Sequence, residues 1–235
     1  MTDHVRWPTS DDVLSARQIV AFIGPLGAGK TEIAINYALA AERSGRATCL
    51  IDLDIVTPYF RVGDYGAELS KAGLRVIAPP GSLARYEAPA LSPEIAGALA
   101  ESDLHVVLDV GGDAHGARLL GTYGPHILRR SHDLWMVVNP FRQGSSLADV
   151  AEQRTNVEES VGLSVTGLVA NPHCGRKTGA SHLKSGWEAI RQWALSLRLP
   201  IVCLAVMDYL SDESPEVDVP TLLLSSHVKL PWETA

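Results

Sequence analysis

The stretch GPLGAGKT at residues 24–31 decides the fold class of this chain, because it matches the pattern G-x-x-x-x-G-K-[ST]. The pattern is informative only where a strand comes before it and a helix comes after it. The apolar run QIVAFIG at 18–24 comes before it, and residues 30–43 carry apolar side chains at helical spacing and are followed by Gly45, a suitable terminator. The stretch is therefore predicted to be a phosphate-binding loop between the first strand and the first helix.

The residue types of this loop suit the phosphates of a nucleotide. Small residues let consecutive backbone N–H groups converge on phosphate oxygens, and the N-terminus of the following helix adds partial positive charge. Lys30 is expected to reach the β- and γ-phosphates, and the Thr31 hydroxyl is expected to bind Mg²⁺. The predicted nucleotide-binding residues of the loop are Gly24, Gly27, Ala28, Gly29, Lys30 and Thr31.

On the C-terminal side of this loop, short apolar runs alternate with helical patterns along the chain. The runs lack the in-and-out alternation of a half-exposed sheet, and those after the first are at 47–53, 74–78, 105–110, 134–139, 164–171 and 200–206. Continuous apolar strands are typical of a parallel sheet that is covered on both faces. Further helices are predicted at 146–160, with Ser146 as N-cap and Asp149 three residues later, and at 180–197.

Strands that alternate with helices predict right-handed crossovers and a doubly wound sheet. The expected fold class is α/β, a P-loop NTPase domain with three layers, α/β/α, and a mostly parallel sheet of about seven strands. We expect one domain across residues 1–235, with residues 1–17 as a polar N-terminal extension. In such a fold, ligands bind beyond the carboxyl ends of the strands.

The composition argues against several classes of protein. The 235 residues include 27 acidic and 20 basic side chains, a formal net charge of −7, which argues against wrapping of nucleic acid. No apolar run reaches the roughly 20 residues that cross a bilayer. The polar start MTDHVRWPTSDD is unlike a signal peptide, and the three cysteines are far apart. We expect a cytoplasmic protein without disulfides, with no membrane partner and no wrapped nucleic acid.

Two further strands are predicted to bring acidic residues to the ligand edge. The fourth apolar run ends at Asp109, which would hold Mg²⁺ through a water, and Gly112 would bring a backbone N–H toward the γ-phosphate. The second run ends beside Asp52 and Asp54, which point the same way if the strand continues through them. Two carboxylates so close are costly without a cation. The predicted metal site consists of Thr31, Asp54 and Asp109.

These residues resemble the MinD/ParA/CobQ group of P-loop NTPases, which pairs a phosphate loop with an Asp-x-Asp after the second strand. The stretches DLDIVTPYFR at 52–61 and DVGGD at 109–113 look like those of a bacterial subgroup described only as ATP-binding proteins. The resemblance implies that Asp54 is the switch I carboxylate, that Asp109 holds the Walker B position and that Asn171 reads adenine. The guanine signature Asn-Lys-x-Asp does not occur at Asn171, so ATP is favoured over GTP.

One position departs from the pattern of the group. Many members carry a second lysine just after the first glycine of the loop, which crosses a nucleotide-sandwich dimer. This chain has Pro25 there, and Leu26 follows where a glycine is common. Hydrolysis activated across a dimer by that lysine is therefore not expected, although a homodimer stays open as a partner state. Arg61 and Arg142, both at the predicted ligand edge, are alternative sources of the positive charge.

Other side chains at this edge are weaker candidates. Asp113 and His115 follow Gly112, where one of them would position water or a substrate if it acts in catalysis. The pair HC at 173–174 lacks a second ligand motif, so a zinc site is not expected. The loop at 79–89 also follows a strand, and loops on this edge often carry specificity. Its candidate contacts to a second substrate or partner are Arg85, Tyr86 and Glu87.

The combined expectation is a protein that binds Mg-ATP and hydrolyses it slowly to ADP and phosphate, with Lys30, Asp54 and Asp109 as catalytic residues. Three roles stay open: a nucleotide-dependent switch or assembly ATPase, a kinase or synthetase that activates a small carboxylate, and a module that binds ATP without hydrolysis. Phosphate release that rises with protein concentration would favour the first role. Release that depends on an added metabolite would favour the second, and tight binding without release the third.

Overall fold

The computed structural model describes residues 13–54, 62–78 and 92–227. Within them, eight strands form one sheet in the order β3-β2-β4-β1-β5-β6-β7-β8, and every neighbouring pair is parallel. The strands are β1 (Ile19–Ile23), β2 (Thr48–Leu53), β3 (Arg75–Ile77), β4 (His105–Val110), β5 (His132–Val138), β6 (Gly167–Ala170), β7 (Ile201–Met207) and β8 (Thr221–Leu224).

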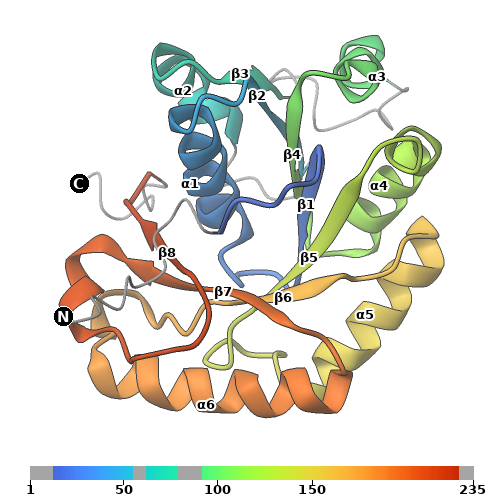
Figure 1. The fold of residues 1–235 in the computed structure, drawn as a ribbon. Coiled ribbons are helices and arrows are strands. Elements are labelled where there is room, and N and C mark those ends of the chain that lie inside the picture. The colour runs from blue at the N-terminus through green and yellow to red at the C-terminus, as the bar shows by residue number, and fades with distance from the viewer. Residues whose placement is uncertain (1–12, 55–61, 79–91, 228–235) are drawn as a thin grey trace, which may run out of the picture.

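Helices cover both faces of this sheet. In Figure 1, α1 lies on one side and α4, α5 and α6 line the other, which gives the three predicted layers. The α-helices of the described segments are α1 (Lys30–Arg43), α2 (Gly66–Lys71), α3 (Pro93–Ala100), α4 (Ala114–Ile127), α5 (Leu147–Val161) and α6 (Ala180–Leu197). Short 3₁₀ turns occur at η2 (Val62–Tyr65), η3 (Gly175–Lys177) and η4 (Asp208–Glu213).

The helices predicted from apolar spacing are confirmed, with bounds that agree within one residue. The ranges 30–43 and 180–197 coincide with α1 and α6. α5 begins just after Ser146, whose hydroxyl accepts from the Asp149 N–H at 3.2 Å, while the Asp149 carboxylate accepts from the Ser146 N–H at 2.9 Å. Gly45 has a φ of 88°, the left-handed conformation expected of a helix terminator.

The predicted parallel sheet is confirmed: within the described residues it has eight strands where about seven are expected, and all of its strand pairs are parallel. The additional strand, β8, has four residues and pairs with β7 at the edge of the sheet. Leu222 and Leu224 are buried, whereas Leu223 between them is exposed. A four-residue edge strand is too short for its periodicity to be separated from that of a loop.

The sheet centre explains why the apolar runs are continuous. Every residue of β1, β2 and β4 is buried, because both faces of these strands contact helices or loops. The buried rings of Phe22, Tyr37 and Trp135 pack edge-on, with centroids 5.3 Å apart for Phe22 and Tyr37 and 5.5 Å apart for Tyr37 and Trp135. This core holds the strands in fixed register beneath the carboxyl edge.

The predicted N-terminal extension is part of the packed structure from Val13 onward. Val13 is buried, the Ser15 N–H donates to the Tyr37 hydroxyl at 3.0 Å, and the Ser15 hydroxyl donates to the Asp133 carboxylate at 2.6 Å. Residues 1–12 lie outside the described residues. No helix in the described ranges combines the length and apolar character that a bilayer crossing requires.

Candidate functional site

The topology brings the loops after β1, β2, β4, β5 and β6 to one edge of the sheet. β1 lies between β4 and β5, so the strand order changes direction beside the phosphate loop. In open α/β sheets, such a point leaves a crevice at the carboxyl ends of the strands, where ligands bind. The candidate residues would form one site only if their side chains meet at this edge.

The phosphate loop is formed, and its glycines adopt conformations that other residues avoid. Gly24, Gly27 and Gly29 have φ values of 143°, 75° and 97°. A Cβ at Gly24 would lie 2.3 Å from the Val137 carbonyl oxygen, so a side chain there would collide with β5. The three glycines allow the tight turn that the predicted phosphate cradle requires.

Lys30 is the buried cation of this loop. Its side chain is 5% exposed, and its Nζ donates to the Pro25 carbonyl oxygen at 3.1 Å. Burial lowers the pKa of Lys30, whereas the charges of Asp109, Asp54 and Asp113 oppose that shift. The structure thus places the lysine among the acidic residues that the sequence assigned to the same site.

Asp109 is the penultimate residue of β4 and lies directly opposite Asp52 of β2. The two residues are register partners, and both are buried. Burial raises the pKa of Asp109 to about 8, and the charge of Asp52 acts in the same direction; the Thr31 hydroxyl and the Lys30 ammonium oppose the shift. Thr31 is close enough to exert this effect, yet neither carboxylate oxygen of Asp109 has a hydrogen bond of good geometry to the described residues.

Asp52 and Asp54 have different roles in the structure. The Asp52 carboxylate accepts the backbone N–H of Asp54 at 2.9 Å, which fixes the turn after β2. The Asp54 carboxylate lies against Gly111, where its Oδ1 is 3.2 Å from the position that a Cβ would take. Asp54 is thereby held beside the end of β4, near Lys30 and Asp109, as the sequence predicts.

Gly112 closes the mouth of the phosphate loop. A Cβ on this residue would lie 2.8 Å from each of three atoms: the carbonyl oxygen of Gly24, the backbone nitrogen of Leu26 and the Nζ of Lys30. Two of these, the Leu26 nitrogen and the Lys30 ammonium, are donors that suit a terminal phosphate, and a methyl group on Gly112 would fill the space beside them. The predicted proximity of Gly112 to the γ-phosphate position fits this geometry.

Asn171 contacts the phosphate loop rather than standing apart from it. Its Nδ2 donates to the Ala28 carbonyl oxygen at 2.6 Å, and a Cβ on Gly29 would lie 2.3 Å from the same nitrogen. The side chain is buried and ties the end of β6 to the loop. This contact is a structural role that the sequence did not predict, and base recognition by Asn171 stays a prediction.

Arg142 lies beside the same loop. A Cβ on Gly27 would be 3.9 Å from both the Cδ and the Nε of the Arg142 side chain. Burial lowers the pKa of His173, and the Arg142 charge adds to this effect, so the guanidinium also lies near the loop after β6. Arg61 falls outside the described residues, as do the loop candidates Arg85, Tyr86 and Glu87.

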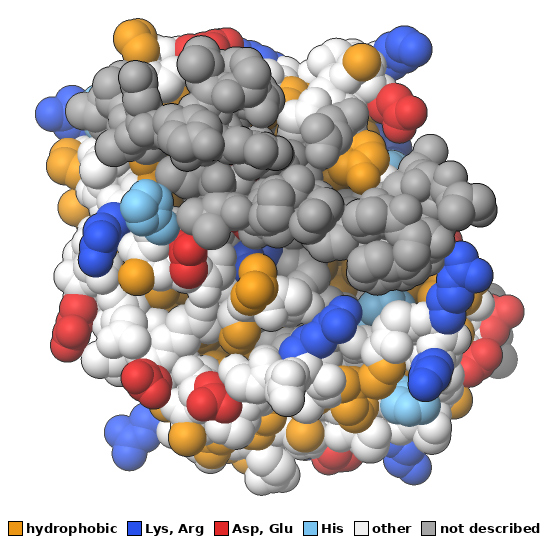
Figure 2. Space-filling view, turned by 180° about the vertical axis from the view of Figure 1, so that it is seen from behind, with side chains coloured by type: hydrophobic (Ala, Val, Ile, Leu, Met, Phe, Trp, Pro, Cys, Tyr) orange, Lys and Arg blue, Asp and Glu red, His pale blue; other side chains and the backbone are white. Residues whose placement is uncertain are grey.

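On one face of the molecule, the positive and negative side chains of the described residues are mixed. Figure 2 shows one face, on which the Lys and Arg side chains of the described residues are interspersed with Asp and Glu, and neither sign forms a continuous patch. Among the residues that the structure describes, Lys30 and Arg142 are the cations placed at the loop.

Asp113 and His115 occupy the start of α4. The Asp113 carboxylate accepts the N–H groups of His115 and Gly116 at 3.1 and 2.9 Å, which makes it the N-cap of this helix. The His115 side chain is exposed. A capping role thus accounts for Asp113, and catalysis by either residue stays a prediction.

Mg²⁺ is the metal that the site's chemistry implies. No group of three or more His, Cys, Asp or Glu side chains within the described ranges is arranged to hold an ion by itself. Mg²⁺ needs fewer protein ligands, because it keeps several waters and binds substrate phosphates. The Thr31 hydroxyl and the unsatisfied carboxylate of Asp109, with Asp54 nearby, fit such a site.

Two residues that the sequence did not single out support the site. The buried Asn139 donates from Nδ2 to the His173 carbonyl oxygen at 2.8 Å and accepts the Phe141 N–H at 3.1 Å, so it joins the loops after β5 and β6. Gln153 of α5 donates to the Gly112 carbonyl oxygen at 3.2 Å. An asparagine at a strand end was a usable signal, whereas nothing in the helical pattern distinguished Gln153.

Comparisons with known proteins identify the fold. No family model matches this chain, and no curated protein matches its sequence. Similar solved structures include the signal recognition particle 54 kDa protein of Aeropyrum pernix in complex with GDP, with 21% identity over 81% of this chain and a TM-score of 0.54. FtsY of Thermotoga maritima gives 16% identity over 80% of this chain and a TM-score of 0.53, and FtsY of Mycoplasma mycoides gives 14% identity over 80% and 0.52.

These likenesses concern the fold alone, because the sequence identities are low. The chain spans 42% of the length of the first of these proteins, and 61% and 59% of the two FtsY chains. Together with the formed loop and the parallel sheet, they show that this chain has the three-layer α/β/α fold of the P-loop NTPases.

Proposed function

We propose that this protein binds a nucleoside triphosphate with Mg²⁺ at the phosphate loop, prefers ATP, and hydrolyses it slowly as a nucleotide-dependent switch. The observation that carries the proposal is the buried pair of Lys30 and Asp109 at the loop. The Lys30 ammonium and the Asp109 carboxylate, which has no hydrogen-bond partner among the described residues, are costly to bury, and a Mg-nucleotide would compensate both. The GKT pattern and the formed loop support the same ligand.

Each residue of the site has a distinct task in this proposal. The loop N–H groups and Lys30 bind phosphate oxygens, and Thr31 with Asp109 holds the metal and its waters. Asp54 orients a water near the terminal phosphate, and Gly112 approaches that phosphate with its backbone. When bound, Mg²⁺ neutralises phosphate charge and orients the phosphates for in-line attack. Phosphoryl transfer needs this positioning and charge stabilisation rather than a covalent intermediate.

Arg142 is proposed to supply a cation from within the same chain. Its side chain lies beside Gly27, and Pro25 stands where the MinD/ParA/CobQ group carries a second lysine. An arginine suits a phosphate because its planar guanidinium donates several hydrogen bonds at once. Hydrolysis would then need no lysine from a second copy.

The preference for ATP rests on the resemblance to the MinD/ParA/CobQ group and on the sequence Asn-Pro-His-Cys at 171–174, which lacks the guanine signature. The structure of one similar protein was determined in complex with GDP, so the test includes both an adenine and a guanine nucleotide. Calorimetric titration with non-hydrolysable analogues of ATP and GTP, each with Mg²⁺, measures the choice directly. Tighter binding of the GTP analogue would reverse the assignment of the base.

The decisive substitution is Lys30→Ala. Because Lys30 is the buried cation of the loop, its removal should lower the affinity for the Mg-ATP analogue at least 100-fold, a loss of about 3 kcal/mol for a charged hydrogen bond to phosphate. Lys184→Ala, at an exposed lysine of α6, is the matched control and should bind like the unsubstituted protein. Equal binding by Lys30→Ala and the control would remove the phosphate loop from the proposal.

A further inference from the structure

Gln153 connects α5 to the mouth of the phosphate loop. Its Nε2 donates to the Gly112 carbonyl oxygen at 3.2 Å, a contact between residues 41 positions apart in the chain. The Oε1 of the same amide is buried and has no hydrogen-bond partner among the described residues. The reverse orientation of the amide would set two acceptor oxygens against each other, so the Gly112 carbonyl determines which end of the amide faces it.

The backbone of Gly112 lies at the mouth of the phosphate loop. The space in front of its Cα lies between the Gly24 carbonyl oxygen, the Leu26 nitrogen and the Lys30 Nζ. A peptide carbonyl turned into that space would repel a phosphate oxygen, because both atoms are hydrogen-bond acceptors with negative partial charge. Glycine allows such a turn more readily than any other residue. A hydrogen-bond donor that holds the Gly112 carbonyl toward α5 prevents this rotation of the peptide.

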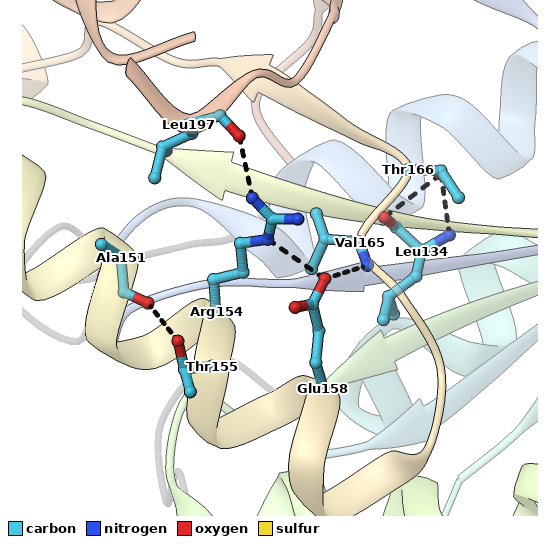
Figure 3. A network of polar contacts seen from close by, with 8 residues as sticks. All are labelled: Leu134, Ala151, Arg154, Thr155, Glu158, Val165, Thr166 and Leu197. Carbon is cyan, nitrogen blue, oxygen red and sulfur yellow. Dashed lines mark hydrogen bonds and ion pairs between the residues drawn. The ribbon is translucent and has the colours of Figure 1, made fainter.

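α5 is anchored firmly enough to act as this support. Figure 3 shows Arg154, the residue after Gln153, bonded through Nη1 to the Leu197 carbonyl oxygen at 2.9 Å and through Nε to Glu158 at 3.1 Å. The Glu158 carboxylate also accepts the Val165 N–H at 2.8 Å, just before β6. These bonds tie α5 to the end of α6 and to the approach to β6.

α5 also packs closely against α4, the helix that follows Gly112. A Cβ on Gly121 of α4 would lie 2.7 Å from the Ser160 carbonyl oxygen of α5, and one on Gly124 would lie 3.1 Å from the Val161 carbonyl oxygen. Such backbone proximity leaves the two helices little freedom to slide. The Gly112 segment is therefore held between α4 and α5, with Gln153 as its polar contact.

We infer that Gln153 is a positioning residue that holds the Gly112 carbonyl toward α5 and thereby lets the site favour a nucleoside triphosphate over a diphosphate. The inference rests on the proposed function, since it concerns the same phosphate site. In the proposed site, the α- and β-phosphates would contact the loop itself, whose N–H groups do not depend on the orientation of Gly112. A third phosphate would lie beside Gly112, so its binding alone would depend on Gln153.

The test is calorimetric titration of the full chain with a non-hydrolysable ATP analogue and with ADP, both with Mg²⁺. Gln153→Met keeps the length and helix preference of the side chain but removes the donor. Its affinity for the triphosphate analogue should fall about 3- to 10-fold, the worth of one neutral hydrogen bond, while its affinity for ADP stays within about twofold. Gln153→Glu should lose more, because a carboxylate faces the carbonyl and repels the phosphate.

Glu152→Gln is the matched control, because Glu152 is the exposed neighbour on the same turn of α5. It should leave the ratio of the two affinities unchanged. A purely structural role of Gln153 would lower the melting temperature, or both affinities together, without changing their ratio. An unchanged ratio in Gln153→Met, and in Gln153→Leu as a second donor-free variant, would overturn the inference. If the unsubstituted protein bound neither nucleotide, the proposed function itself would fail.

Discussion

At the scale of single residues, the close packing at the phosphate loop explains why small residues occupy it. A Cβ at Gly24 or Gly29 would lie 2.3 Å from a neighbouring atom, the Val137 carbonyl oxygen in one case and the Asn171 amide nitrogen in the other. The loop is therefore shaped by β5 and β6 as much as by its own sequence. A methyl group is enough to change it.

Gly112→Ala tests this packing at a position with ordinary backbone angles. The added methyl would lie 2.8 Å from Lys30 Nζ and from two backbone atoms of the loop, so the Gly112 segment must move away. We expect the affinity for the Mg-ATP analogue to fall at least 10-fold, about 1.4 kcal/mol. Titration calorimetry gives the affinity, and circular dichroism checks that the fold is kept.

The matched control is Gly97→Ala in α3, where a Cβ would meet nothing within 4 Å. That substitution should leave nucleotide binding unchanged and stabilise the protein by up to about 1 kcal/mol, because alanine favours helix interiors over glycine. If both variants bound the analogue equally well, the space in front of Gly112 would not be part of the phosphate site.

At the scale of elements, β4 carries two buried titratable groups, Asp109 with a raised pKa and His105 with a lowered pKa. Asp109 at its carboxyl end faces the site, whereas His105 at its start packs against Tyr37, with ring centroids 5.8 Å apart. Burial lowers the pKa of His105 to about 4, and the positive charge of Arg46 acts in the same direction. Its Nε2 has no hydrogen-bond partner among the described residues. The strand is therefore built around a neutral histidine.

This histidine should make the fold sensitive to acid. In the unfolded chain His105 binds a proton below its ordinary pKa of 6.5, whereas in the folded chain it stays neutral down to about 4. The free energy of unfolding is therefore unaffected by this group above pH 6.5 and decreases as the pH falls toward 4. The decrease caused by His105 between pH 6.5 and 4.5 is about 2 kcal/mol.

Urea unfolding at pH 6.5 and 4.5 measures the effect. His105→Phe keeps a ring against Tyr37. Its free energy of unfolding should decrease by about 2 kcal/mol less than that of the unsubstituted protein over this pH range. His115→Gln, at an exposed histidine, is the control and should show the full loss. A His105→Phe variant as acid-sensitive as the control would show that other groups cause the loss.

At the scale of the whole molecule, nucleotide binding should stabilise the fold, because the site draws residues from α1, β2, β4 and the loops after β5 and β6. A ligand at 100 times its dissociation constant adds about 2.7 kcal/mol to the free energy of unfolding. For a chain of this length, that corresponds to a rise in melting temperature of roughly 5–10 °C.

Differential scanning fluorimetry with and without Mg²⁺ tests this coupling. The Mg-ATP analogue should raise the melting temperature, and EDTA should remove most of the rise, because the acidic residues at the loop repel an uncompensated triphosphate. Lys30→Ala is the control and should show a rise of at most about 1 °C at the same ligand concentration. An equal rise with and without Mg²⁺ would contradict the metal assignment of Thr31 and Asp109.

Much of this molecule is predictable from its sequence, because its signals are local. The GKT pattern lies between an apolar run and a helical pattern, so β1, the loop and α1 follow from neighbouring residues alone. Continuous apolar runs indicate the parallel sheet, and the spacing from Ser146 to Asp149 indicates the capping box of α5. Strand ends carrying Asp54 and Asp109 also predict which side of the sheet holds the site.

The contacts that the site residues make depend on the tertiary structure. Asn171 ties β6 to the loop, Asp52 fixes the turn that holds Asp54, and Gln153 reaches Gly112 across 41 residues. No periodic pattern in the sequence indicates these contacts, since each depends on the register and crossing of separate elements. The fold and the expectation of a nucleotide ligand therefore follow from the amino-acid sequence alone, because both rest on short-range patterns. The contacts that support the site form only where strands and helices that are distant in the sequence meet.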